Sequence, residues 1–410
     1  MSGRDAILAS GTSHAMRRLP HPLAAATALT LALMTASCGE GGVSEGVSDS
    51  EIIVGTHVDL TGPVSGWGIA VRNGIEMAFA EANAAGGING RMLRLVVEDN
   101  GYDPRRAISA VQKLISRDHV FAVLAPLGTP TVEATIERVI ESGTLHLFPL
   151  TAAPSAYEPF HPLKFAALAP YGPMMRAGLR ELLKERSFNR ICGIFQSDDF
   201  GTALREGTVE GLKAHGLEFL ATESLARADA DASAQVALLK ESQCDLVILG
   251  TIAEAALTVL SAAQDLEWSP VFLGSQAIYQ PSLAAEPKGL TDGLYAMGQV
   301  AMPYPDDPDG AIRSWIGRYE ERFGTRAGVE ALAGYDLANL FIAALQATGH
   351  DLTRERFAEA LEGLPLWTEG ALGHAPLDYS ANDHLGVRGG FLARVKDGRW
   401  VTIAPVVIAE

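Results

Sequence analysis

Side chains able to bind a small molecule follow several apolar, strand-like runs of the sequence. Trp67 follows EIIVGTHVDL, Thr129 follows VFAVLAP, and Gln276 follows PVFLG. Hydroxyl and amide groups exchange hydrogen bonds with polar ligands, and aromatic rings pack on apolar groups, so these residue types predict reversible binding of a small polar molecule. The predicted ligand-binding residues are Trp67, Gly128, Thr129, Leu150, Thr151, Ala152, Tyr171, Phe200 and Gln276.

Thr129 stands directly before Pro130 and a helix-like run. This order predicts that Thr129 is the N-cap and that Pro130 is the first helical residue. The N–H groups at a helix start are unpaired and lie at the positive end of the helix dipole, so together with the Thr129 hydroxyl they can hold a carboxylate. The alternative is that Thr129 only caps the helix.

The elements that position these residues alternate between strand and helix. From residue 51 to residue 149, apolar runs such as VFAVL and LHLFPL alternate with helix-period runs, one of which begins at Pro104. Strands that are apolar throughout are typical of parallel sheets covered by helices on both faces. After PLKFAALAPYGP, residues 162–173, the same alternation begins again. The predicted fold class is therefore α/β, with two doubly wound parallel-sheet lobes joined by a multi-strand hinge.

The end of the chain supplies further elements. Three helical runs occupy about 303–385, and the strand-like runs GGFLARV and RWVTIAP flank Asp397-Gly398, a strong hairpin signal. We predict that lobe 1 comprises 51–169 plus about 303–385, and that lobe 2 comprises 170–302 plus about 386–410. The hinge is expected near Ala169-Pro170 and Met302-Pro303.

The amino terminus predicts export. Arg17 and Arg18 precede the apolar stretch LAAATALTLALM, which ends at small residues and Cys38, so residues 1–38 are expected to be a signal peptide with Met16 as the true start. The order of small residues and cysteine resembles a lipobox, which implies lipidation of Cys38; plain signal cleavage is the alternative. Residues 39–50 are expected to be a flexible tether.

Charge and cysteine content narrow the function. The formal net charge is −17. Residues 1–38 contribute +2 from Arg4, Arg17, Arg18 and Asp5, so the remaining chain is near −17 − 2 = −19. This acidity argues against nucleic acid and anionic membrane surfaces as partners. Besides Cys38, only Cys192 and Cys244 remain; we expect buried free thiols, with a disulfide as the alternative.

Catalytic and metal motifs are absent from the sequence. It has no GxSxG, HExxH, P-loop or CxxC pattern, so we predict no enzyme, no cofactor and no metal. Gly66-Trp67-Gly68 is only a fragment of a dinucleotide-binding motif, which leaves a nucleotide-dependent enzyme as a remote alternative. His374, Asp378 and His384 are interpreted as loop residues, and Asp309 of PDDPDG as a residue at a helix start.

Taken in order, these segments resemble the type I periplasmic binding proteins, in particular the leucine/isoleucine/valine-binding branch that serves ABC importers. The segments that carry the resemblance are the export signal, LTGPVSGWG, EDNGYDPRRA, APLGTPTVEA, QSDDFG, GYDLANL and the closing hairpin. They cover essentially all of residues 50–405. The resemblance implies a receptor that closes on a small solute and delivers it to a membrane permease.

The resemblance also assigns roles to single residues. Trp67 matches an aromatic residue that packs on the ligand, Thr129 a hydroxyl residue that binds the ligand carboxylate, and Phe200 a ring at the site. Ala152 stands where amino-acid binders have a threonine, and Gln276 where they have a glutamate facing the ammonium group. The ligand is therefore expected to be an amino acid, an amide, or a small carboxylate or aromatic acid. Thr151, Asp198, Asp199 and Glu254 are candidates to replace the missing acid.

We accordingly expect an exported, monomeric solute receptor, in the periplasm or on the outer face of the cell membrane. It would touch the membrane only through a lipid anchor. The alternative is the ligand-binding component of a signalling system.

Overall fold

The computed structural model describes residues 44–408 apart from 228, 287–288 and 369–371. These residues fall within one compact unit, Gly41–Glu410. The predicted signal peptide and Cys38 lie outside the described residues. Among the residues described, no helix has the length and apolar character needed to cross a membrane.

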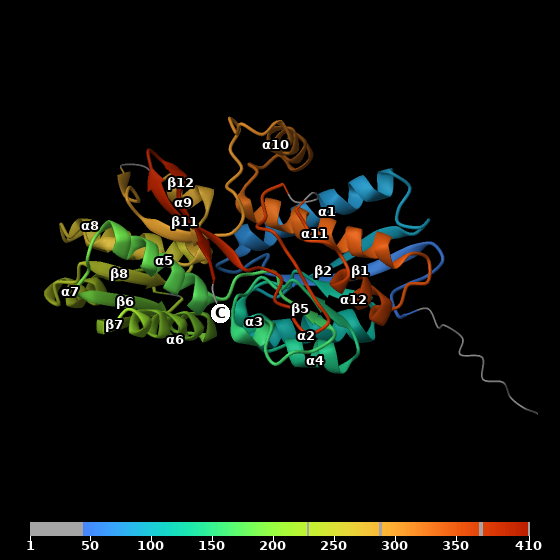
Figure 1. The fold of residues 1–410 in the computed structure, drawn as a ribbon, viewed down its shortest axis with the longest axis horizontal. Coiled ribbons are helices and arrows are strands. Elements are labelled where there is room, and N and C mark those ends of the chain that lie inside the picture. The colour runs from blue at the N-terminus through green and yellow to red at the C-terminus, as the bar shows by residue number, and fades with distance from the viewer. Residues whose placement is uncertain (1–43, 228, 287–288, 369–371, 409–410) are drawn as a thin grey trace, which may run out of the picture. The chain divides into compact units, whose positions relative to one another are not determined.

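The first half of the chain forms a five-stranded parallel sheet (Figure 1). Its strand order is β2-β1-β3-β4-β5, so from β1 the chain adds β2 on one side and then β3, β4 and β5 on the other. Such an order creates a crevice at the carboxyl ends of the strands. The strands are β1 Glu51–Val58, β2 Met92–Asp99, β3 Ala122–Leu124, β4 Leu145–Leu147 and β5 Lys164–Phe165.

Helices from both ends of the chain pack around this sheet. α1 packs along α11, which comes from late in the sequence (Figure 1). A Cβ atom on Gly74 would lie 2.1 Å from the Ala331 oxygen, and one on Gly334 would lie 2.4 Å from the Val71 oxygen, so only glycine permits this close approach. The helices are α1 Ser65–Ala84, α2 Pro104–Ser116, α3 Thr129–Glu133, α4 Ile136–Glu141, α10 Gly310–Phe323, α11 Val329–Thr348 and α12 Arg354–Glu362.

The middle of the chain and its carboxyl-terminal hairpin form a seven-stranded sheet in the order β12-β11-β10-β9-β8-β6-β7. The strands from β6 to β10 are parallel, whereas β11 and β12 form an antiparallel hairpin at one edge. The strands are β6 Ile191–Gln196, β7 Phe219–Leu225, β8 Leu246–Gly250, β9 Val271–Gly274, β10 Tyr295–Gly298, β11 Gly389–Lys396 and β12 Arg399–Val407. The helices between them are α5 Tyr171–Glu185, α6 Asp199–Ala214, α7 Ser233–Glu241, α8 Ala253–Asp265 and α9 Pro281–Ala284.

Local sequence signals explain several element boundaries. The Asp103 carboxylate accepts a hydrogen bond from the Arg106 N–H, and Pro104 is the first residue of α2 as predicted. The predicted hairpin is confirmed, since Asp397 and Gly398 alone separate β11 from β12 and both have positive φ. Asp309 caps α10, as expected for the end of the PDDPDG run.

Two boundaries differ from the predictions. β5, a strand of only two residues, falls inside the run interpreted as an interruption, because a pair of residues carries no periodicity. LTGPVSGWG was expected to be a glycine-rich loop, but α1 begins at Ser65, so Trp67 lies in its first turn. The Asp59 carboxylate accepts hydrogen bonds from the N–H groups of Thr61 and Val64, which turns the chain tightly from β1 into α1.

Three chain segments that connect the two sheets run side by side. Ala166 forms a bridge to Leu385, and Val300 forms a bridge to His374. The Gln299 side chain joins the segments, because its amide nitrogen donates to the Ala167 oxygen at 2.9 Å and its amide oxygen accepts from the Ala169 N–H at 2.8 Å. The two-sheet α/β fold class is confirmed, whereas the exact lobe boundaries stay predictions.

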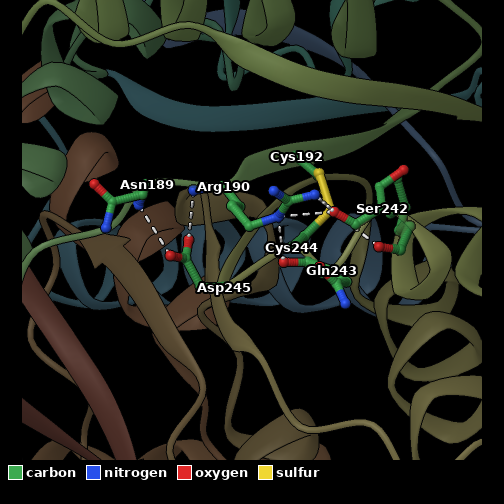
Figure 2. The surroundings of a disulfide bond; sticks show 8 residues. Asn189, Arg190, Cys192, Ser242, Gln243, Cys244 and Asp245 are labelled. Carbon is green, nitrogen blue, oxygen red and sulfur yellow. Dashed lines mark hydrogen bonds between the residues drawn. A yellow bond between two sulfur atoms is a disulfide. The ribbon is translucent and has the colours of Figure 1, made fainter.

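Cys192 and Cys244 form a disulfide, so the expectation of free thiols was wrong. Cys192 lies in β6 and Cys244 just before the neighbouring strand β8, which places their Cα atoms 5.9 Å apart, within reach of a disulfide. Hydrogen bonds hold the residues before β8 against the start of β6 (Figure 2). The Asp245 carboxylate accepts from the N–H groups of Asn189 and Arg190, and the Arg190 guanidinium donates to the Ser242 backbone oxygen. The two cysteines are far apart in the sequence, and they come close because β6 and β8 are neighbours in the sheet.

Removing the disulfide should destabilise the protein. The bond closes a sequence separation of 52 residues, and by loop-closure entropy such a bond contributes about 4 kcal/mol to the free energy of unfolding. The double variant Cys192→Ala/Cys244→Ala should therefore melt at a lower temperature by calorimetry, and wild-type protein in reductant should approach the same value. An unchanged melting temperature would contradict this account.

Candidate functional site

A cavity of about 300 Å³ lies at the carboxyl ends of strands from both sheets. Residues after β1, β2, β3 and β4 line one side, and residues after β6, β8, β9 and β10 line the other. The α11 residues Val329 and Ala333 complete the wall. In parallel α/β sheets this edge is where ligands bind, so the cavity is the candidate functional site.

The structure brings most of the predicted binding residues together around this cavity. All of them except Thr151 and Ala152 line it. Thr151 and Ala152 are buried directly behind the wall, where the Ala152 oxygen accepts a hydrogen bond from the Tyr171 N–H at 3.2 Å. Ala152 thus supports the position of Tyr171 through its backbone.

Three hydroxyl groups form a cluster at one wall of the cavity. The Thr129 hydroxyl lies 2.7 Å from the Thr151 hydroxyl and 3.3 Å from the Tyr171 hydroxyl. Of these three residues, Thr129 and Tyr171 line the cavity, and both are buried, with exposed fractions of 2% and 6%. The Ala153 N–H also donates to Thr151. We name Thr129, Thr151 and Tyr171 the hydroxyl cluster.

Thr129 is not the helix cap that its sequence context predicts. The N-cap of α3 is Gly128, which has a φ of 106°, and Thr129 and Pro130 are the first two helical residues without a side-chain cap. A Cβ atom on Gly128 would lie 2.8 Å from the Tyr102 ring, so glycine is required there. Because the Thr129 hydroxyl is not used for capping, it is available to the cavity.

Aromatic rings flank the hydroxyl cluster. Tyr171 and Phe200 pack edge to face with ring centroids 5.5 Å apart. Burial raises the pKa of the Tyr171 hydroxyl, in opposition to hydrogen bonds that lower it, so this group stays a hydrogen-bond donor at neutral pH. Trp67 lines the cavity from α1 and is partly buried against the core. A Cβ atom on Gly68 would lie only 1.8 Å from the Asp59 oxygen, so this glycine lets the first turn of α1 pack on the end of β1.

Gln276 lies at the cavity but also holds the chain that connects the two sheets. Its amide nitrogen donates to the Ala169 oxygen at 3.1 Å. This bond gives Gln276 a structural role that its sequence context did not indicate. Its side chain carries no charge, so it cannot neutralise an ammonium group.

The acidic residues considered as substitutes take different positions. Glu254 lines the cavity and is exposed at the start of α8. Asp198 is the N-cap of α6 and accepts from the Gly201 N–H, and Asp199 is not among the residues that line the cavity. Glu254 is the only charged side chain among the described lining residues.

Tyr102 is a lining residue that the sequence predictions missed. It follows β2 within EDNGYDPRRA, so the rule that ligands bind after parallel strands would have identified it. Burial and the nearby Asp198 carboxylate raise its pKa well above the usual value. The lining residues of α9 and α11, such as Leu283 and Val329, have no comparable signal, because tertiary packing alone brings these helices to the cavity.

Other titratable residues that the sequence analysis considered do not line the cavity. The His384 ring faces the Glu362 carboxylate, whereas His374 lies beside Gln299. Asp306 of PDDPDG pairs with Arg399. Within the described ranges, no three His, Cys, Asp or Glu side chains are grouped as a metal site requires.

Comparison with known families agrees with this geometry. The family model described as "Periplasmic binding protein" matches residues 51–399. The chain belongs to the periplasmic binding protein family. It is therefore a solute-binding protein of the extracytoplasmic compartment, and the resemblance inferred from the sequence is confirmed.

This periplasmic binding protein is similar to other proteins in sequence and to several solved structures in fold. The leucine-, isoleucine-, valine-, threonine- and alanine-binding protein of Pseudomonas aeruginosa is 22% identical over 305 residues, which cover 74% of this chain and 79% of the relative. A fatty acid ABC transporter substrate-binding protein from Thermomonospora curvata superposes with a TM-score of 0.80 at 23% identity, covering 90% of this chain and 95% of the other. An R. palustris ABC transporter solute-binding protein in complex with benzoate has a TM-score of 0.76 at 18% identity, covering 87% and 97%.

A contact between the two halves of this periplasmic binding protein lies beside the cavity. The guanidinium of Arg227, which follows β7, donates to the backbone carbonyl oxygen of Tyr102 at 2.6 Å. Its guanidinium carbon lies 4.9 Å from the centroid of the Tyr102 ring. Since Tyr102 follows β2 of the other sheet, this contact stabilises the arrangement in which both sheets face the cavity.

The variant Arg227→Ala should weaken solute binding. A hydrogen bond and a cation–π contact are together worth roughly 1–2 kcal/mol, so the dissociation constant should rise about 10-fold. Isothermal titration with a solute found by thermal-shift screening would measure the effect. Arg205→Ala, which alters an exposed arginine of α6, is the matched control. Equal affinities for wild type and Arg227→Ala would show that the contact does not support the bound arrangement.

Proposed function

We propose that this protein is the solute-binding component of an ABC importer and that it delivers its solute to a membrane permease. The single observation that carries the proposal is the cavity at which the strand ends of both sheets meet. The ABC transporter proteins from Thermomonospora curvata and R. palustris support it by their shared fold. In this proposal the protein acts as a monomer without catalysis, metal or cofactor.

The predicted site residues take defined roles in this proposal. The hydroxyl cluster donates hydrogen bonds to the polar end of the solute, while Trp67, Leu150 and Phe200 cover its apolar part. Solute contacts with both halves favour the closed arrangement, and the segments beside Gln299 act as the hinge. Gln276, bonded to the Ala169 oxygen, couples the cavity wall to this hinge.

The proposal includes an anchored location. Residues 1–38 act as the export signal, and Cys38 carries the lipid. Of the predicted tether 39–50, the part that precedes Ser44 would link the lipid to the body, because Ser44, Gly46 and Ser48 are hydrogen-bonded to Arg354, Ile53 and Arg91. A single lipidated cysteine leaves the folded body free to reach a permease, which suits delivery of a captured solute. A receptor for a separate signalling protein would use the same cavity, and only the identity of the membrane partner distinguishes the two functions.

Replacing Thr129 should test the site. Thermal-shift screening against amino acids, amides, and aliphatic and aromatic acids would first find stabilising solutes. Loss of one hydrogen bond to a charged ligand group costs about 1.5–3 kcal/mol, so Thr129→Val should raise the dissociation constant about 10- to 100-fold.

The matched control for this test is Thr208→Val. Thr208 is also a buried threonine, and its hydroxyl donates to the Leu204 oxygen within α6, away from the cavity lining. This variant should bind solute as wild type does. If Thr129→Val bound as tightly as Thr208→Val, Thr129 would have no role in binding, and if no solute stabilised the wild type, the importer proposal itself would fail.

A further inference from the structure

We infer that the solute is an apolar acyl compound without an ammonium group. It has one head that accepts hydrogen bonds, either a carboxylate or its carboxamide, on an apolar body. This inference rests on the proposed function and narrows its ligand class. Three features of the cavity support it: the neutral donors of the hydroxyl cluster, the placement of charge, and the apolar part of the wall.

The hydroxyl cluster presents neutral hydrogen-bond donors at the cavity wall. Thr129 and Tyr171 line the cavity, and their hydroxyl oxygens lie 3.3 Å apart. Each hydroxyl carries one hydrogen that can rotate toward an acyl oxygen. The hydroxyl oxygens carry no charge, so the cluster can bind an acyl head but cannot neutralise an ammonium group.

The interior of the cavity offers no counter-charge for an ammonium group. Gln276 is neutral, and its amide nitrogen donates a hydrogen bond to the Ala169 backbone oxygen. The Asp198 carboxylate is occupied by the Gln196 amide and the Gly201 N–H. Glu254, the one charged side chain on the described lining, is exposed and solvated. The O–H donors of the cavity wall can hydrogen-bond to a carboxylate or an amide oxygen. An ammonium group needs an acceptor that carries negative charge, and none on the described lining faces the interior, so an α-amino group on the solute would weaken binding.

Much of the rest of the wall is aliphatic and comes from both halves of the molecule, beside aromatic rings and the polar side chains of Gln280, Ser282 and Gln299. A cavity of about 300 Å³, at about 30 Å³ for each water-sized group, holds roughly ten non-hydrogen atoms. Such a space fits a medium-chain or phenyl-substituted acid. The aliphatic lining residues are Leu127, Leu150, Leu168, Ile252, Leu257, Leu283, Val300 and Val329.

Matched pairs of compounds that differ only in the amino group provide the test. The pairs are 4-methylpentanoate with leucine, 3-phenylpropanoate with phenylalanine, and octanoate with 2-aminooctanoate, each titrated calorimetrically into the purified protein. The acid should bind at least about 100-fold more tightly than its amino partner, because the ammonium group has no partner in the cavity. Equal or tighter binding of the amino acids would overturn the inference.

Head group and length are tested with the same protein. Octanamide against octanoate distinguishes the two acyl heads, and tight binding of either supports the inference. From butanoate to octanoate each added methylene should tighten binding about fourfold, with no further gain once the cavity is full. Affinity independent of chain length would overturn the apolar-body assignment.

Glu254→Gln separates this inference from its rival, in which Glu254 holds a cationic group. Removal of the carboxylate should make octanoate bind more tightly, since a like charge at the cavity is lost. Loss of solute binding in Glu254→Gln would overturn the inference. If no pair member bound but an unrelated solute stabilised the protein, the solute-binding function would stand and the acyl inference would fall.

Discussion

The hydrogen bonds that two glutamine side chains make to the backbone of a connecting segment are the constraint on which the site depends. Gln299 holds Ala167 and Ala169, and Gln276 holds the Ala169 oxygen from the far side. Leu168, Gln299 and Val300 also line the cavity. The connection between the sheets is thus itself a wall of the site, so a bound solute and the relative placement of the two sheets depend on each other.

Around this connection the cavity wall combines a cluster of hydroxyl groups with aliphatic side chains. The hydroxyl cluster lies after β3 and β4 and at the start of α5, and aliphatic side chains surround it from the same loops and from α8, α9 and α11. The wall at the hydroxyl cluster is buried and uncharged, and Glu254 at the start of α8 is the one charged side chain on the described lining. Relatives with the same fold include proteins named for a fatty acid and for bound benzoate, and one named for several amino acids. The shared fold alone therefore does not determine the solute.

Local signals allowed much of the fold to be predicted from the sequence. Asp397-Gly398 and Pro104 act through their own backbone preferences, and apolar strands reveal burial on both faces. Thr129 and Gln276 were placed at the cavity correctly because both follow parallel strands, but their partners were not predicted. Thr129 bonds to Thr151 and Tyr171 instead of capping a helix, and Cys192 reaches Cys244 because β6 and β8 are neighbours. Such pairings depend on tertiary placement, which one sequence read locally does not encode.

A structure of the protein with solute bound would test the central claim most directly. The account predicts electron density for one solute in the cavity, with its acceptor head within hydrogen-bond distance of the Thr129 hydroxyl and its body against Leu283 and Val300. Solute bound elsewhere on the protein, or in the cavity with its polar head turned away from the hydroxyl cluster, would contradict the account.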